Sequence, residues 1–256
     1  MTQPSPPLSY REQLDLLKAR GLQVSDDGFA LHCLANYNYY RLSIYWRHFT
    51  VPGNHDQFEN GANFDQIWQL YEFDCALRQL VTEACKRLEV AARSRWAYEL
   101  GHEYGPQAYE DPTVFSHKPN HTKLLAWFDQ RFTESNEEFA VHYKAKHCHR
   151  PEIWVVIELL EFGKFCSFYH NTKEVKLRER IAKHFNLNEP TFASLINNAR
   201  HLRNISAHHS RLWNRKLTAK ITPPKKHPAE LIENVQHFPK SEDDQSRRIY
   251  NPLVLL

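Results

Sequence analysis

Residues 201–215, HLRNISAHHSRLWNR, place an arginine, an asparagine and a histidine within six positions and contain no acidic side chain. Histidine transfers protons near neutral pH, and the planar guanidinium of arginine fits a phosphate group. RNA carries its own nucleophile, the ribose 2′-hydroxyl. Its cleavage therefore needs only a base, an acid and cations that stabilise charge on the phosphorus. Arg203, Asn204 and His208 predict RNA cleavage that requires no metal ion.

A helix would distribute these side chains over neighbouring faces. Asn204 and His208 lie about 40° apart on an ideal helix, whereas Arg203 and His208 lie about 140° apart. One face would carry a polar ladder of Arg200, Asn204, His208, Arg211 and Arg215, and its side an apolar stripe of Leu195, Ala199, Leu202 and Leu212. Together with His209 and Lys216, the cations of the ladder form the predicted RNA-binding surface. By its spacing alone, the Arg-x4-His pattern is more typical of a solvated basic helix face than of a catalytic site.

The net charge of +3 hides an uneven distribution along the chain. Between Thr191 and Ala229 there is no Asp or Glu, and eight basic residues are present: Arg200, Arg203, Arg211, Arg215, Lys216, Lys220, Lys225 and Lys226. The rest of the chain carries a net charge of about −5, so a basic strip stands on an acidic protein. Such a strip attracts polyanions. An RNA-binding module that breaks no bond and a scaffold for an acidic protein partner are the alternatives to an enzyme.

The composition predicts an all-α fold, because the chain has 7 Gly, 14 Pro and abundant helix-forming residues. A capping box at Ser9–Glu12 begins a first helix, and Phe64 to Leu100 is helical without a breaker. The segment Asn188–Pro190 begins the helix of the motif, which is expected to continue until the prolines at residues 221–228. Residues 1–7 are expected to form a flexible tail, and residues 8–256 one domain.

Several function classes are excluded by what the sequence lacks. No apolar segment has the length of a membrane span, and the five cysteines are scattered, which favours a reducing cytoplasm over a disulfide framework. No nucleotide, hydrolase or zinc-protease motif is present, and His147-Cys148-His149 lacks ligand spacing, so neither a cofactor nor a metal site is expected. The aromatic side chains at residues 37–46 suit base stacking, although core packing between helices explains them better.

A longer match gives the motif more weight than its spacing does. The stretch LRNISAHHSRLWNR resembles the signature of the bacterial Abi-like (AbiD/AbiF) abortive-infection family, whose Arg-x4-6-His motif belongs to the HEPN superfamily. Other landmarks follow in the same order: YREQLDLLKARGL, LANYNYYRLSIYW, RLEVAARSRWAYEL, YGPQAYEDP and PEIWVVIELLEFGKFCSFY. The resemblance covers roughly residues 8 to 255.

The resemblance implies an HEPN-like helical bundle with additional N-terminal helices, and metal-independent endoribonuclease action that halts growth during phage infection. Carried onto this chain, Arg203 would hold the scissile phosphate, His208 would act as general base or acid, and Asn204 would orient the phosphate or the imidazole. HEPN sites are generally built across a dimer, so a homodimer is expected. A noncoding RNA or an antitoxin-like regulator is a further expected partner.

Three residues outside the motif are candidates for supporting roles. Glu89 and Arg93 match a polar pair of the family, and an ordinary surface pair at (i, i+4) spacing is the other interpretation. Glu158 interrupts the apolar run WVVIELL and is expected to contact a basic or polar group. The apolar end RRIYNPLVLL either folds back onto the core or, as family members suggest, continues into further helices beyond Leu256.

Overall fold

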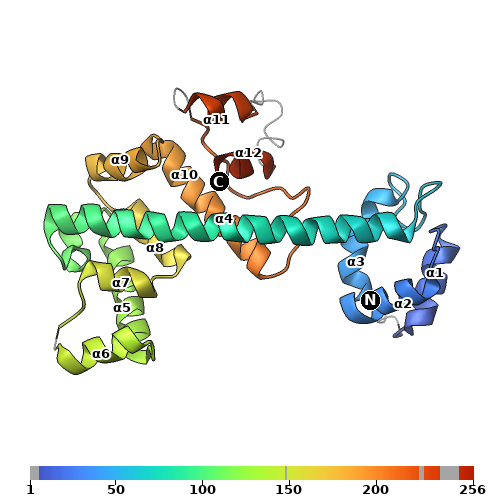
Figure 1. Cartoon of the computed structure of the whole chain (residues 1–256), viewed down its shortest axis with the longest axis horizontal. Coiled ribbons are helices and arrows are strands. Elements are labelled where there is room, and N and C mark those ends of the chain that lie inside the picture. Colours follow the sequence, from blue (N-terminus) through green and yellow to red (C-terminus); the bar gives the residue numbers. More distant parts are fainter. Residues whose placement is uncertain (1–5, 148, 225–227, 237–247) are drawn as a thin grey trace. The chain divides into compact units, whose positions relative to one another are not determined.

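The computed structural model describes residues 6–147, 149–224, 228–236 and 248–256, which form an all-α protein (Figure 1). Lys225, Lys226, Cys148 and most of the predicted N-terminal tail lie outside the described residues. The chain divides into two compact units, residues 1–79 and residues 80–256. The boundary falls inside one uninterrupted helix, so no linker composition marks it.

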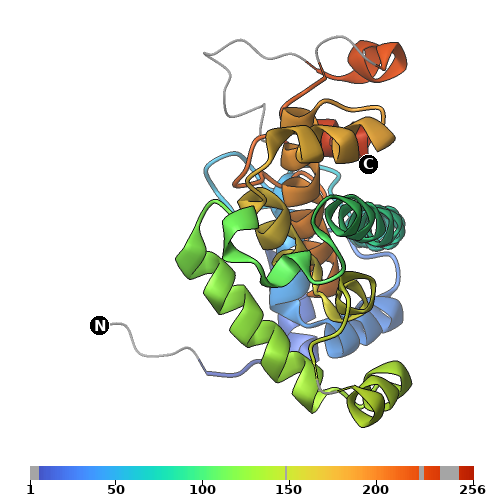
Figure 2. The ribbon, with the colours of Figure 1, turned by 90° about the vertical axis from the view of Figure 1, so that its left-hand side faces the viewer.

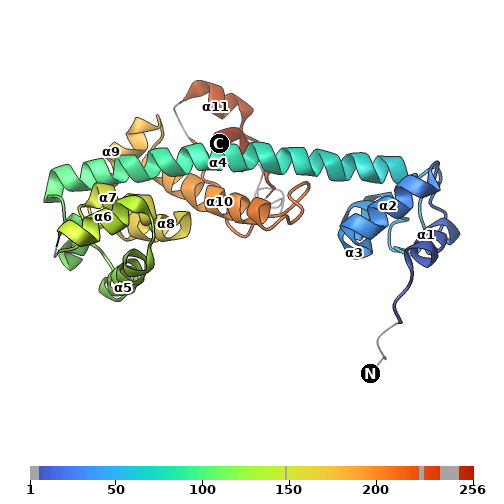
Figure 3. The ribbon, with the colours of Figure 1, turned by 60° about the horizontal axis from the view of Figure 1, so that its bottom comes forward.

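The first unit contains three short helices and the beginning of a long one (Figure 3). They are α1 Tyr10–Ala19, α2 Asp27–Tyr37, α3 Tyr39–Trp46 and α4 Phe64–Tyr104, with the 3₁₀ turn η1 Arg47–Phe49 after α3. The predicted capping box is confirmed, because the Ser9 hydroxyl accepts from the Glu12 backbone and the Glu12 carboxylate accepts from the Ser9 backbone. Asp26 and Asn38 cap the next two helices through their side-chain oxygens.

Most of the aromatic side chains at residues 37–46 pack inside the first unit. Tyr45 and Trp46 are buried, and the Tyr37 ring meets Trp68 at a centroid distance of 5.0 Å and Tyr71 at 5.3 Å. These edge-to-face contacts supply specific geometry as well as apolar burial. Core packing is therefore confirmed for this set, with the exception of Tyr40, which is 80% exposed.

A buried charged network holds α3 against α4 within the first unit. The Tyr45 hydroxyl donates to the Asp74 carboxylate at 2.7 Å, and Arg78 pairs with the same carboxylate one turn further along α4. Arg78 also donates to the Cys75 sulfur at 3.0 Å. Burial raises the pKa of Tyr45, so its phenol remains a donor. Removing one partner would leave a charge in the core without compensation.

The second unit contains the end of α4 and the remaining helices. They are α5 Lys118–Glu134, α6 Glu138–Lys146, α7 Ile153–Leu159, α8 Phe162–Asn171, α9 Val175–His184, α10 Glu189–Ala207, α11 Ala229–Asn234 and α12 Tyr250–Leu255, with the 3₁₀ turns η2 Ala108–Glu110 and η3 Pro112–Val114. Helix α8 packs against both α5 and α10 (Figure 2). Trp96 of α4 is fully buried, lies 5.6 Å from the Phe168 ring and donates its indole N–H to Thr172 at 3.2 Å.

Two buried cysteine side chains touch the backbone of α10. The Cys85 thiol of α4 donates to the Ala199 carbonyl at 3.4 Å, and the Cys166 thiol of α8 donates to the Ile196 carbonyl at 3.6 Å. Burial raises the pKa of each thiol to about 12, so both keep their protons at neutral pH. The predicted apolar stripe is buried in the same region, since Leu195, Ala199 and Leu202 are at most 3% exposed.

The C-terminal residues fold back onto α10. Helix α12 packs against α10, Leu255 is 7% exposed, and the Asn251 side chain exchanges hydrogen bonds with the Gln236 backbone at 2.9 and 2.8 Å. The apolar run at residues 252–256 is therefore packed against the rest of the second unit and not left exposed.

We expect Asp74→Ala to lower the free energy of unfolding of the first unit by about 3–5 kcal/mol, because Arg78 would keep a buried charge without its carboxylate. Tyr45→Phe removes one hydrogen bond and should cost about 1 kcal/mol. Urea unfolding followed by the fluorescence of Trp46 and Trp68 measures both. The exposed pair of Glu83 and Arg87 is the control, and Glu83→Ala should leave stability nearly unchanged. An equally small effect of Asp74→Ala would contradict the assigned role of the network.

Candidate nucleic-acid interface

The three motif residues lie together at the C-terminal end of α10, and all three are exposed. Arg203 and Asn204 belong to the last turns of the helix, and the Arg203 guanidinium donates to the Asn204 side-chain oxygen at 3.4 Å. His208 is the C-cap residue. Its backbone N–H still donates to the Asn204 carbonyl at 3.0 Å, so the expected one-turn spacing between Asn204 and His208 is retained. The buried face of α10 holds this exposed group in place.

A Schellman motif ends α10 directly after the motif. His209 has a left-handed backbone with φ of 53°, its N–H donates to the Ser206 carbonyl, and the Ser210 N–H donates to the Ile205 carbonyl, each at 3.0 Å. Glycine usually occupies this position, but histidine is among the residues that adopt it most readily. The second histidine of the pair therefore has a backbone role that its side chain does not reveal.

The predicted continuation of the helix to residues 221–228 is wrong. Because α10 ends at Ala207, Arg211 and Arg215 do not extend a helical ladder but lie in the loop that follows. Arg215 donates to the Arg211 carbonyl at 3.2 Å, and Lys216 forms an isolated β-bridge with Arg248. Leu212 is fully buried, as predicted, and anchors this loop from outside the helix.

Glu89 and Arg93 form a partly buried pair on α4. Their side chains are 13% and 17% exposed, with 3.5 Å between the Glu89 carboxylate and the Arg93 guanidinium. Arg93 also donates to the Leu160 carbonyl and, at 3.2 Å, to the Ile157 carbonyl, so it satisfies backbone groups at the end of α7. Burial raises the pKa of Glu89, while the positive charges of Arg93 and Arg203 oppose that shift. The pair is therefore not an ordinary surface pair, and Glu89 lies within electrostatic range of Arg203.

Glu158 does not join this group. It is exposed on α7, although its neighbours Ile157 and Leu159 are buried. The expectation that it must contact a basic or polar group is wrong, because the helix turns it toward solvent, where a carboxylate is hydrated.

Arg200 lies on a different side of α10 from Arg203, next to α8. Its guanidinium donates to the Asn197 side-chain oxygen at 2.9 Å and lies 3.1 Å from the ring nitrogen Nε2 of His201. Desolvation by burial and the charge of Arg200 lower the pKa of His201, so the neutral imidazole is favoured as an acceptor. Arg200 also lines a polar cavity with Ser167 and His170, which is separate from the exposed motif.

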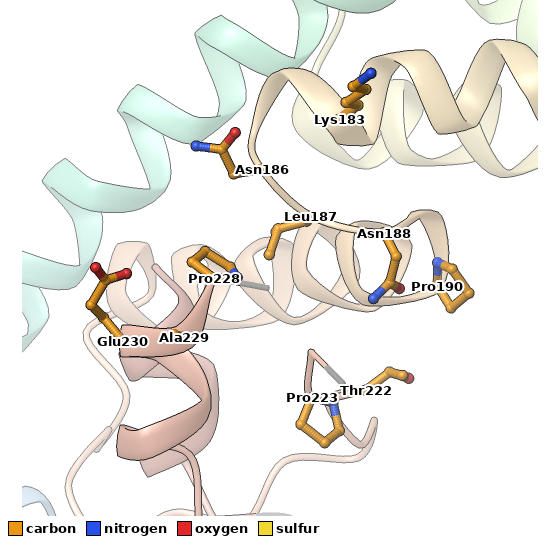
Figure 4. A pocket seen from close by; sticks show the side chains of 10 residues that line it. All are labelled: Lys183, Asn186, Leu187, Asn188, Pro190, Thr222, Pro223, Pro228, Ala229 and Glu230. Carbon is orange, nitrogen blue, oxygen red and sulfur yellow. The ribbon is translucent and has the colours of Figure 1, made fainter. Parts of the chain in front are cut away.

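A larger cavity lies between the α9–α10 turn and the segment before α11, and Figure 4 shows its lining. Its volume is about 1090 Å³, and Leu187, Pro190, Pro223 and Pro228 make much of its wall apolar. It contains none of the predicted site residues. The described residues also hold no group of three or more side chains suited to binding a metal ion.

A sequence model of the Abi-like protein family matches residues 32–214, more than two thirds of the chain. The chain belongs to the Abi-like protein family. This membership supports a role in abortive infection. No curated protein and no solved structure matches the chain. The matched range includes Glu89, Arg203, Asn204 and His208, and it ends at Asn214, before Arg215 and Lys216.

One feature of this Abi-like chain, the polar cavity around Arg200, was not found from its sequence. Asn120, Ser167, His170 and Asn197 meet Arg200 around one cavity although they come from three helices. No spacing rule connects positions so far apart, and only the i, i+3 pair of Asn197 and Arg200 carried a local signal.

Within the described ranges, every helix is too short or too polar to traverse a lipid bilayer.

We expect the backbone at position 209 to matter more for stability than its side chain. His209→Gly keeps the left-handed conformation without a Cβ and should leave the free energy of unfolding within about 1 kcal/mol of the wild type. His209→Val places a β-branched residue at this position and should lower the free energy of unfolding by about 1–2 kcal/mol more than His209→Gly does. Urea titration measures the difference. An equal loss of unfolding free energy in both variants would show that a contact of the imidazole, and not the left-handed backbone, makes this position important for stability.

His201 should make the second unit less stable in acid. Its folded pKa lies below the unfolded value of about 6.5, so its contribution is fully present above that pH and is lost as the pH falls through the folded pKa. His201→Gln retains an acceptor for Arg200 and should reduce the loss of stability between pH 7.5 and 5.0. Urea midpoints at both pH values test this, with His184→Gln on the exposed end of α9 as the control. A slope unchanged by His201→Gln would refute it.

Proposed function

We propose that this chain is a metal-independent endoribonuclease of the HEPN type that acts in abortive-infection defence. The family membership supports the biological role. The observation that carries the chemistry is the exposure of Arg203, Asn204 and His208 together at the end of a helix whose opposite face is buried. A polyanion can approach this end of α10, since no Asp or Glu occurs between residues 191 and 229.

The reaction follows from the chemistry of these side chains and of RNA. Arg203 binds the non-bridging oxygens of the scissile phosphate, and Asn204 orients the phosphate or the imidazole. His208 takes the proton of the ribose 2′-hydroxyl as that oxygen attacks phosphorus, or donates a proton to the departing 5′-oxygen. The P–O2′ bond forms and the P–O5′ bond breaks. The products are a 2′,3′-cyclic phosphate and a 5′-hydroxyl end, and no metal ion takes part.

One histidine supplies one of the two proton transfers, so a second motif completes the site. A homodimer in which two α10 ends face each other would provide a base from one copy and an acid from the other. Glu89 then holds Arg203 by its charge, and Arg93 holds Glu89. A noncoding RNA or an antitoxin-like regulator that covers this surface would restrain the activity in the cytoplasm.

An RNA-binding module without catalysis is the second candidate. The basic strip continues past the helix through Arg211, Arg215 and Lys216, which favours a long contact with a nucleic-acid backbone. In that case RNA affinity falls steeply with salt and no cyclic phosphate product forms. A protein scaffold with an acidic partner would instead be indifferent to RNA.

His208→Ala should reduce RNA cleavage in the presence of EDTA by at least about 10²-fold, because a positioned proton-transfer group contributes about 10²–10⁴-fold. RNA binding and the thermal unfolding midpoint should stay near wild-type values, since the imidazole is exposed. The measurement is the appearance of 2′,3′-cyclic phosphate ends on a labelled RNA. The matched control is His184→Ala, another exposed histidine at a helix end, which should cleave like the wild type. Unchanged cleavage by His208→Ala would remove this residue from the mechanism.

A further inference from the structure

A polar cavity of about 290 Å³ lies where α8 and α10 meet the start of α5. Its wall includes Asn120, Ser167, His170, Asn171, Asn197 and Arg200. None of the lining residues is acidic. A polar cavity with a cation and several amides, and without a carboxylate, is suited to an anionic ligand with several acceptor oxygens.

Arg200 is the cation of this cavity, and none of the described carboxylates forms an ion pair with it. Its guanidinium donates to the Asn197 side-chain oxygen and faces Nε2 of His201, whose neutral form is favoured by burial. Its Nε atom is buried and makes no hydrogen bond within the described part of the chain. A half-buried guanidinium with an unsatisfied N–H is costly, and an oxyanion in the cavity would remove that cost.

The amides around Arg200 divide into structural and available groups. Asn171 is occupied, because its oxygen accepts from the His117 backbone N–H at 2.7 Å and its nitrogen donates to the His117 carbonyl at 3.2 Å. Among the described residues, Asn197 makes a hydrogen bond only through its oxygen, toward Arg200, which leaves its NH₂ group as a donor. The Asn120 side chain adds a second amide at the rim. Arg200 and these amides therefore present N–H donors from α10 and α5.

Gly163 keeps the space next to the guanidinium open. A Cβ at this position would stand 3.7 Å from Cδ of Arg200, in ordinary van der Waals contact, so the glycine is not required by the packing of the helix itself. A larger side chain here would narrow the cavity next to Arg200 without removing its charge. The cavity is at the small end of ligand pockets, which suits a phosphate with part of a ribose and not a longer nucleotide segment.

We propose that this cavity binds a phosphoryl group, supplied by a mononucleotide or by the phosphate of an RNA chain, through Arg200 and the amides of Asn197 and Asn120. The site is distinct from the Arg203–His208 group, because Arg200 points toward α8 and the motif residues are exposed at the helix end. Binding here requires no chemistry at His208. Binding of an RNA phosphate at this site rests on the proposed function, whereas binding of a mononucleotide does not.

His170 lines the same cavity and is surrounded by several charged groups. Desolvation lowers its pKa; Glu189 opposes this shift, and Arg178 and Arg200 add to it.

Titration calorimetry of the full chain with inorganic phosphate and with AMP tests the proposal. Arg200→Gln should weaken both by about 10- to 100-fold, since it removes charge-assisted hydrogen bonds. The matched control is Arg87→Gln, an exposed arginine on α4 outside both the cavity and the motif, which should bind within about twofold of the wild type. Loss in both variants, or in neither, would overturn the assignment of the cavity.

A second variant guards against a folding defect in Arg200→Gln. Gly163→Leu fills the cavity and keeps the arginine, so it should also abolish phosphate binding while circular dichroism and the unfolding midpoint stay near wild type. Retained binding in this variant would place the phosphate elsewhere and refute the proposal.

The source of the phosphate is separated in a His208→Ala background, which cannot cleave by the proposed mechanism. A 5′-phosphorylated RNA that binds more tightly than its 5′-hydroxyl counterpart, in an Arg200-dependent way, identifies an RNA end. AMP binding without that difference identifies a free nucleotide. If neither binds through Arg200, the proposal fails even where cleavage is observed, and phosphate binding without any cleavage leaves this site standing while the proposed nuclease function fails.

Discussion

The position of α10 depends on how closely it packs between α4 and α8. Cys85 and Cys166 contact its carbonyls from the two neighbouring helices, and Ala199 and Ile196 are fully buried between them. Small side chains at these contacts let the backbones approach, and close packing transmits any change of volume directly to the helix. This packing sets the direction in which each candidate functional side chain on α10 points.

Two arginines three residues apart on α10 have different neighbours as a result. Positions i and i+3 lie about 60° apart around a helix, and Arg200 lines the cavity beside α8 while Arg203 lies within electrostatic range of Glu89 of α4. The same helix therefore supplies a guanidinium to a partly enclosed cavity and another to an open surface. A partly enclosed cation binds one small group selectively, whereas an open one contributes to long-range attraction that salt screens.

The helical class, the start of α10 and its apolar stripe could be predicted because they depend on local signals. Asn188, Glu189 and Pro190 form a helix entry that the structure confirms, with the Asn188 side chain accepting from the Thr191 backbone. The end of the helix could not be predicted, because the left-handed position is filled by His209 and not by glycine. The division of the chain inside α4 has no signal either, since periodicity continues through Gln79 and Leu80.

For the candidate site too, the parts that depend on residues near in sequence could be predicted, and the parts that depend on tertiary packing could not. Arg203, Asn204 and His208 are near in sequence, and their common exposure was predictable from one helix. The cavity around Arg200 depends on Asn120 and Ser167, which only tertiary packing brings to α10. Glu89 was found from the family resemblance, yet its burial beside Arg93 and its reach toward Arg203 required the structure.

The two thiols that touch α10 are poorly placed to react with oxidants. Oxidation begins from the exposed thiolate, whereas Cys85 and Cys166 are at most 3% exposed and burial raises the pKa of each to about 12. The contacts that set the direction of α10 should therefore survive mild oxidation, and Arg200, Arg203 and His208 should keep their positions under conditions that modify exposed thiols.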